Sequence, residues 1–191
     1  MNNILSILIC SLSKRKEYLD ELLECLKPQL VKGVQVLINS DGGKKSVGCK
    51  RNELVTSASG KYIAFVDDDD LVSDDYVSLI LEAVEGGCDV VGIHLLMTRR
   101  LDINSECRTY HSLKYKEWYD EPDPDRAGRK RYYRNPNHLN PVKREFALAT
   151  LFPAIDSGED HDYSKRLLPL LKTEVYIESP IYHYQAERDK V

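Results

Sequence analysis

The chain has 191 residues, of which 42% are hydrophobic, and a formal net charge of −4. This length fits a single domain, residues 1–191, with one well-filled core. The acidic balance, with a pI near 5.8, argues against a nucleic-acid-binding surface, so no nucleic-acid partner is expected.

The five cysteines are odd in number and widely spaced. This pattern resembles neither a disulfide framework nor a paired zinc site, and it favours a reducing, cytoplasmic location. The apolar run at the N-terminus lacks a basic flank and is short enough to be a strand, so neither a signal peptide nor a membrane span is expected. Peripheral association with a membrane and the oligomeric state stay open.

The first 90 residues alternate between apolar runs and helical patterns. Residues 4–10 predict a buried strand, and leucines at helical spacing then continue until Pro28. Further strands are predicted at 34–38 and 62–66, with a helix over 47–59 between them. Ser73 is expected to cap the next helix, with Asp74 and Asp75 in its first turn. This alternation predicts an α/β fold with a mainly parallel sheet and helices on both faces.

The second half is less regular. Residues 89–98 and 106–113 predict a strand hairpin with a turn at 102–105. Residues 120–138 are polar, proline-rich and strongly charged, which predicts either disorder or a mobile lid over a site. Helices are expected from 143 towards 152 and from 157 onward. Two final strands are predicted at 174–178 and 181–184.

Polar side chains follow three of the predicted strands. Four consecutive acids, Asp67 to Asp70, come directly after the strand at 62–66, and Ser11–Ser13 and Ser40–Gly43 follow the other two. The carboxyl ends of parallel strands meet at one edge of a sheet, so these clusters are expected to converge. The acid run by itself fits either a Mg²⁺ or Mn²⁺ site, assisted by Lys50 or Arg51, or a solvated acidic loop. Neither GxGxxG after the first strand nor GxxxxGK[ST] occurs, which excludes the usual dinucleotide and P-loop signatures.

Four segments in this order, SDGG, CKRN, GKYIAFVDDDD and GEDHD, resemble those of family 2 glycosyltransferases of the GT-A fold. The resemblance covers most of the chain, and GKYIAFVDDDD is its most specific part. It implies a Rossmann-like three-layer sandwich with a mainly parallel mixed sheet and a small hairpin or loop region on the acceptor side. Residues 1–100 would then form the nucleotide-sugar-binding half, and residues 101–191 the half with the acceptor side and the catalytic base.

The resemblance also implies roles for residues of the donor site. Asp41 matches the aspartate that pairs with the nucleotide base, and Arg51 with Asn52 matches a pair near the diphosphate. Asp69 matches a direct ligand of Mn²⁺ or Mg²⁺, while Asp67 would face the ribose or the water shell of the metal. The other candidates are Ser11 and Asp68 for the donor, and Asp70, expected to face the acceptor or a helix amide.

Asp160, in Gly158-Glu-Asp160, matches the catalytic base of inverting members, and Glu159 would orient the acceptor. A base on a different element from the metal site keeps its affinity for a proton. The alternative for Asp160 is a helix N-terminal acid that serves only the helix dipole. His183 falls where many GT-A enzymes return a late residue to the metal. Its alternative is an ordinary hydrogen-bonding histidine.

The charged segment offers two further candidates. The basic residues at 129–131 could clamp a diphosphate, although a solvated loop explains them equally, and Tyr132 and Tyr133 could stack on a sugar. No QxxRW signature of processive members follows Asp160, so a single-sugar transfer is expected.

The expected function is a metal-dependent, inverting transfer of one sugar from a nucleoside diphosphate sugar to a saccharide or other hydroxyl acceptor. UDP is the favoured nucleotide, and polysaccharide or glycoconjugate synthesis is the expected process. Two alternatives stay open at this point. One is a sugar-phosphate nucleotidyltransferase, and the other is a sugar-nucleotide-binding module without turnover.

Overall fold

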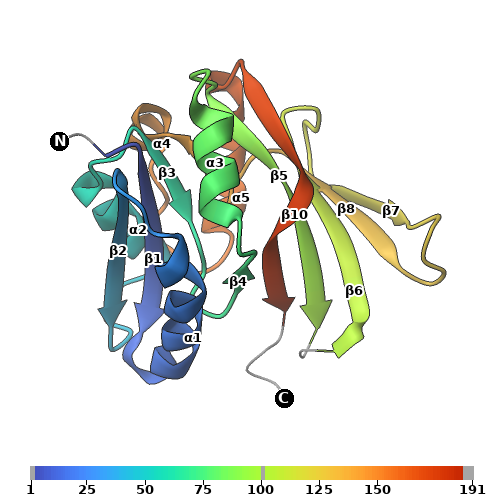
Figure 1. The fold of residues 1–191 in the computed structure, drawn as a ribbon, viewed down its shortest axis with the longest axis horizontal. Helices are drawn as coiled ribbons and strands as arrows, with labels where there is room; N and C mark the ends of the chain where they lie inside the picture. The colour runs from blue at the N-terminus through green and yellow to red at the C-terminus, as the bar shows by residue number, and fades with distance from the viewer. Residues whose placement is uncertain (1–2, 100–101, 187–191) are drawn as a thin grey trace.

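The computed structural model describes residues 3–99 and 102–186 (Figure 1). The boundary between the two expected halves, at residues 100 and 101, lies outside the described residues. The α-helices are α1 (Lys16–Leu26), α2 (Val47–Ser57), α3 (Tyr76–Val84), α4 (Arg144–Thr150) and α5 (Glu159–Leu167). The strands are β1 (Leu5–Leu12), β2 (Val34–Asp41), β3 (Tyr62–Phe65), β4 (Leu71–Val72), β5 (Val90–Arg99), β6 (Asp102–His111), β7 (Tyr119–Pro122), β8 (Lys130–Arg134), β9 (Val142–Lys143) and β10 (Glu174–Ala186).

The described strands form one mixed sheet in the order β2-β1-β3-β9-β5-β6-β8-β7, with β10 beside β5 and β4 beside β10. Its core is parallel, because β1 pairs with β2 and β3, and β5 pairs with β10, in the parallel sense. The antiparallel pair β5 and β6 continues the sheet away from the helices. An α/β fold with a parallel core in a mixed sheet is thereby confirmed.

Two clusters of buried apolar side chains cover the two faces of the sheet. One joins the strands to α1 and α3, which stand in front of the sheet in Figure 1, and the other joins them to α2, α4 and α5. The strand β1 serves both layers, since Ile7 belongs to the first cluster and its neighbour Leu8 to the second, as the alternation of a strand requires. The three-layer arrangement follows from this two-sided burial. It holds the carboxyl ends of β1 and β3 in place.

One helix start differs from the expectation. The helix α3 begins at Tyr76 with Asp75 at the N-cap position, and no acid lies in its first turn. Ser73 does not cap the helix; its hydroxyl instead donates to the Asp75 carboxylate at 2.6 Å. The placement of Ser73, Asp74 and Asp75 was therefore wrong, because the helix begins two residues later than expected. A local side-chain hydrogen bond competes with the capping bond here.

The hairpin of β5 and β6 is confirmed, but its return strand begins earlier than expected. Residues 102–105 belong to β6, in which Asp102 pairs with Arg99 of β5, so the turn predicted there is wrong. The two strands predicted at 174–178 and 181–184 are one strand, β10. Irregularities in its pairing with β5 around Pro180 take the place of a break.

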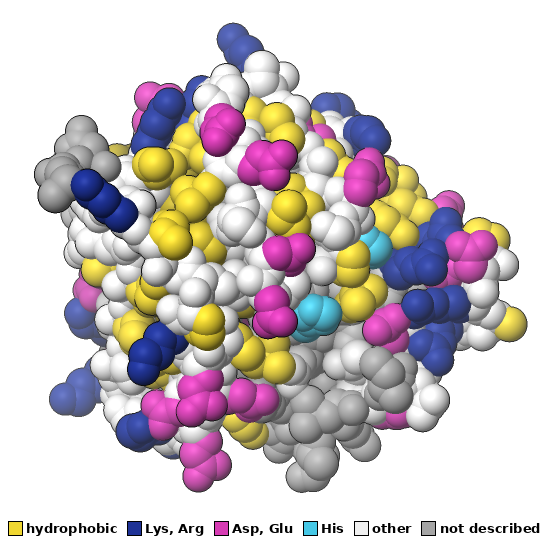
Figure 2. All heavy atoms as spheres, in the orientation of Figure 1, with side chains coloured by type: hydrophobic (Ala, Val, Ile, Leu, Met, Phe, Trp, Pro, Cys, Tyr) yellow, Lys and Arg dark blue, Asp and Glu magenta, His cyan; other side chains and the backbone are white. Residues whose placement is uncertain are grey.

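The largest difference concerns residues 120–138, which are neither disordered nor a separate lid. They contain β7 and β8, an antiparallel pair that β8 attaches to β6. Several charges of the segment are paired within this sheet extension, where basic and acidic side chains alternate over the right-hand side of Figure 2. The ion pairs are Arg126 with Glu106, Arg131 with Asp123 and Asp125, and Lys130 with Asp120.

Candidate active site

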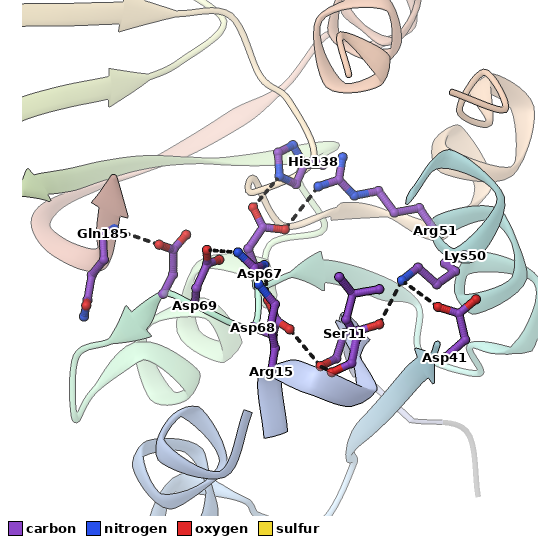
Figure 3. Close-up of polar contacts among 12 residues, drawn as sticks. Ser11, Arg15, Asp41, Lys50, Arg51, Asp67, Asp68, Asp69, His138 and Gln185 are labelled. Carbon is purple, nitrogen blue, oxygen red and sulfur yellow. Dashed lines mark hydrogen bonds and ion pairs between the residues drawn. The ribbon is translucent and has the colours of Figure 1, made fainter. Parts of the chain in front are cut away.

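The polar ends of β1, β2 and β3 meet at one edge of the sheet, as expected (Figure 3). The hydroxyl of Ser11 donates to the Asp68 carboxylate at 2.7 Å. The buried ammonium of Lys50, on α2, donates to the Ser11 carbonyl at 2.8 Å and to Asp41 at 3.3 Å. Ser11, Asp68 and Lys50 border an open cavity of about 550 Å³, whose wall also contains Lys44 and Lys45.

The four acids of the run have different partners. Asp67 receives hydrogen bonds from Arg51 at 3.1 Å and lies 3.3 Å from His138. The guanidinium of Arg15 bridges the next two acids, with 2.9 Å to Asp68 and 2.9 Å to Asp69. Figure 3 shows these two groups of cations reaching the run from different elements. The acids of the run thus contact Arg51 of α2, Arg15 from the segment after β1 and the imidazole of His138 from the loop before β9.

Asp70 is fully buried and faces the last strand. It accepts hydrogen bonds from the Tyr182 hydroxyl and from the backbone amide of Gln185, both at 2.7 Å. The expectation that Asp70 faces the acceptor or a helix amide was therefore wrong, because the amide that it meets belongs to β10. Asp70 ties the acid run to β10 and so helps to fix the shape of the cavity wall.

The surroundings shift the pKa values of the four acids in different directions. Burial raises the pKa of Asp67, but His138 and Arg51 outweigh this effect and hold that pKa well below its usual range. Burial raises the pKa of Asp68 and of Asp69, against the charge of Arg15. Burial and the nearby charge of Asp67 raise the pKa of Asp70 well above its usual range. Asp67 is thus the acid most strongly held in the charged form.

Arg51 joins the acid run to the start of α5. Its guanidinium is buried and donates to Glu159 at 2.7 Å as well as to Asp67. The same group lies over the rings of Phe65 and Phe152, at 5.7 and 5.3 Å from their centroids. Glu159 is itself buried. The carboxylate of Glu159 is therefore committed to an ion pair, and it fixes Arg51 between two acids.

A second cavity of about 480 Å³ adjoins the first, and residues from the acid run and from α5 line both. Asp160 lines only the second cavity, where it follows Glu159 at the N-terminus of α5. Across from this helix the wall comes from β5, β6 and β8 and from the loop before β9. The residues shared by the two cavities are Arg51, Asp67, Asp156, Glu159 and Tyr184.

Three sequence candidates lie away from both cavities. Asp41 accepts hydrogen bonds from the backbone amides of residues 43–45 and thereby closes the turn after β2. The amide of Asn52 exchanges two hydrogen bonds with the backbone of Phe152, at 2.9 and 2.7 Å. His183, on β10, pairs with Leu71 of β4 and lines neither cavity, whereas the next residue, Tyr184, lines both. A role of His183 at the metal stays a prediction.

Of the candidates from the charged segment, one lines a cavity and the others do not. Tyr132 lines the second cavity, whereas Tyr133 stacks between Tyr110 and Tyr119. The basic side chains of residues 129–131 bond to Glu106, Asp120, Asp123 and Asp125 within the sheet extension. Only the tyrosine at 132 is thus placed to meet a ligand of this site.

The sequence was also compared with known proteins. A family model described as glycosyl transferase family 2 matches residues 7–141. The chain belongs to glycosyl transferase family 2. Among curated proteins, none matches this chain.

Solved structures with a similar fold include TarS of S. aureus. Residues 1–349 of TarS in complex with UDP-GlcNAc are 13% identical, with a TM-score of 0.67, over 96% of this chain and 59% of that one. Another TarS structure is 14% identical, with a TM-score of 0.69, over 96% of this chain and 37% of that one. The family 2 chain therefore spans less than two thirds of these proteins. At this identity the likeness establishes the GT-A fold.

The carboxylates of the acid run are candidate ligands for a divalent cation. In residues 3–99 and 102–186, no group of three His, Cys, Asp or Glu side chains is arranged to hold a metal. Mg²⁺ and similar ions in nucleotide sites, however, take one or two carboxylates, with substrate phosphates and water as the other ligands. Asp67 and Asp69 both line the first cavity, and burial, together with the like charges of Asp67 and Asp68, raises the pKa of Asp69. A cation would relieve that repulsion, so these two carboxylates fit such an ion.

Sequence reasoning missed two residues of the site. Arg15 is one of three consecutive basic residues directly after β1, and this basic run at a strand end is a signal that could have indicated it. His138 gave no signal, because it lies in the segment that was expected to form a loop.

Among the described helices, none is long and apolar enough to span a membrane.

Proposed function

We propose that this family 2 protein transfers a single sugar from a nucleoside diphosphate sugar to a hydroxyl group of an acceptor, with inversion at the anomeric carbon. The observation that carries the proposal is the pair of adjoining cavities that share Asp67, Arg51 and Glu159. A reaction between two substrates needs two sites that meet at one point, because the reacting atoms must come within about 3.5 Å of each other. Here that point lies between the acid run and the start of α5.

The first cavity is proposed as the donor site. Its wall combines the acid run with the basic side chains of Arg15, Lys44 and Lys45, which suit a diphosphate. UDP is the favoured nucleotide, since TarS, which has this fold, is solved in complexes with UDP-GlcNAc and UDP. Asp69 and Asp67 would hold Mn²⁺ or Mg²⁺, which supplies positive charge to the leaving diphosphate.

The second cavity is proposed as the acceptor site, with Asp160 as the general base. The neighbouring Glu159 is engaged by Arg51, which leaves Asp160 as the carboxylate of α5 that can receive a proton. We therefore assign Glu159 a positioning role: it holds Arg51 against Asp67. The proposed chemistry then places cations on the donor side and a base on the acceptor side.

In the proposed reaction the acceptor oxygen forms a bond to the anomeric carbon while the bond from that carbon to the phosphate oxygen breaks. The hydroxyl proton passes to Asp160, and the electron pair of the broken bond leaves with the nucleoside diphosphate. Cys10 borders the donor site, but burial raises its pKa to about 12, so it stays a thiol and is unsuited to act as a nucleophile. A single displacement therefore accounts for the reaction with the groups present.

The cellular setting belongs to the same proposal. All five cysteines are free of disulfides, which is consistent with a cytoplasmic enzyme. Polysaccharide or glycoconjugate synthesis is the process that fits a transfer to a saccharide hydroxyl.

The test is a product analysis with the purified protein, Mn²⁺ or Mg²⁺, sugar donors of UDP, GDP and dTDP, and a panel of saccharide acceptors. Release of nucleoside diphosphate with a glycosylated product is the expected result. Release of pyrophosphate from a sugar phosphate and a nucleoside triphosphate would instead identify a nucleotidyltransferase. Donor that binds tightly and stays intact with every acceptor would indicate a binding module.

A further inference from the structure

Two guanidinium groups line the second cavity without a carboxylate partner. Arg99 comes from β5 and Arg134 from β8, and neither forms an ion pair within the described residues. Arg51, in the wall shared with the first cavity, is by contrast paired with two acids. Arg99 and Arg134 therefore place two cations in the wall of the second cavity that no carboxylate of the described residues contacts directly.

Arg134 is nevertheless held firmly in place. Its guanidinium donates to the backbone carbonyls of Tyr119 and Tyr133, both at 2.9 Å. It also lies over the rings of Trp118 and Tyr132, at 5.0 and 5.3 Å from their centroids. These contacts orient the cation without cancelling its charge. Burial lowers the pKa of Arg134, against the charges of nearby acids that include Asp160. Burial therefore destabilises the charged form of this side chain.

The hydrogen-bonding chemistry of this wall is one-sided. Guanidinium and indole N–H groups donate hydrogen bonds and accept none. The indole nitrogen of Trp118, which is buried in the same wall, has no acceptor among the described residues. Among the described residues, Asp160 is the one carboxylate that lines the second cavity and not the first, and its Oδ1 atom accepts a hydrogen bond from the backbone amide of His161 at 2.8 Å. Such donors bind oxygen acceptors, and they bind negatively charged oxygens most strongly.

We propose that the acceptor carries an oxyanion, a phosphate or a carboxylate, which Arg134 and Arg99 bind while the acceptor hydroxyl faces Asp160. This inference rests on the proposed function and names the substrate class of its acceptor site. The donor diphosphate is a weaker source of the anion, because neither arginine lines the first cavity, which has its own cations at Arg15, Lys44 and Lys45.

The test measures the binding of matched probes to the whole protein by titration calorimetry in the presence of UDP and Mn²⁺. Glucose 6-phosphate and glucuronate represent the two oxyanions, and glucose is the neutral probe. At least one anionic probe is expected to bind about tenfold or more tightly than glucose, and this preference is expected to weaken as salt is added. The tighter of the two anions then shows which oxyanion the site prefers.

Arg134→Gln is expected to abolish the preference for the anion and to leave the affinity for UDP unchanged. Lys130→Gln is the matched control, because it removes the same charge from the same strand at a side chain outside the second cavity. Arg99→Gln, at an exposed position, tests the same claim if Arg134→Gln does not fold. Arg134→Lys is expected to keep part of the preference, since it retains the charge.

Two results would overturn the inference. One is equal affinity of the parent protein for charged and neutral probes. Absence of detectable binding for every probe counts as this result. The other is a loss of UDP affinity in Arg134→Gln as large as its loss of anion affinity, which would assign the arginine to the donor. Failure of the parent to bind UDP would instead count against the proposed function, so the two failures are distinguishable.

Discussion

Replacement of Arg51 by methionine is expected to destabilise the protein by about 3–5 kcal/mol, the usual cost of leaving a buried charge without its partner. Methionine keeps an apolar chain of similar length against Phe65 and Phe152, so the loss of charge dominates. Most of the cost comes from Glu159, whose side chain is only 8% exposed and lies 2.7 Å from the guanidinium. Asp67 contributes less, because its side chain is 29% exposed and His138 remains beside it.

The assay is urea unfolding followed by circular dichroism, with Lys16→Met as the control. Lys16 also forms an ion pair with an acid, Asp20, but both side chains are largely exposed, so its loss should cost at most about 0.5 kcal/mol. In the double variant Arg51→Met with Glu159→Gln, more than half of the lost stability should return, because the unpaired charge of Glu159 is gone. The reasoning would be refuted if Arg51→Met and Lys16→Met lost the same stability.

Two further predictions concern packing and pH. Gly48→Ala should lower the free energy of unfolding by about 1–3 kcal/mol in the same assay, since a Cβ there would lie 1.8 Å from the Pro153 carbonyl oxygen. Gly86→Ala is the control, because a Cβ at that position meets open space. Burial lowers the pKa of His111 to about 3, so the native state keeps it neutral while the unfolded chain takes up a proton below about pH 6.5. Stability should therefore fall by up to about 1.4 kcal/mol per unit as the pH drops from 6.5 towards 3. His111→Gln should flatten this dependence, and an unchanged slope between pH 6.5 and 4.5 would contradict the assignment.

The parts of the fold that the sequence could predict are those with strong local signals. Tyr62–Phe65 is a short apolar run that ends in acids, and the structure makes it a fully buried strand with Asp67 at the cavity. The start of α5 after Gly158 was predictable as well, because acids in a first turn indicate a helix N-terminus. The convergence of Ser11 with the acid run follows from the parallel order of the strands.

The remaining parts depend on partners that are distant in the sequence. The segment of β7, β8 and the loop between them is rich in charged residues, and the loop residue Arg126 pairs with Glu106 of the neighbouring strand β6. No local pattern shows that pairing. The same holds for His138, which reaches Asp67 across 71 positions of the chain, and for Asn52, whose partner is the backbone of Phe152. Side-chain roles in this site are set by such long-range contacts.

The most direct test of the central claim compares Asp160→Asn with Asp162→Asn in a transfer assay with the donor and acceptor that the parent uses. Asp162 lies in the same first turn of α5, but it pairs with Arg166 and lines neither cavity. Asp160→Asn is expected to lower the rate of transfer by about 100-fold or more, as loss of a general base does, while the affinity for the donor stays unchanged. Asp162→Asn should transfer at the parental rate. Equal rates for the parent and Asp160→Asn would contradict the account.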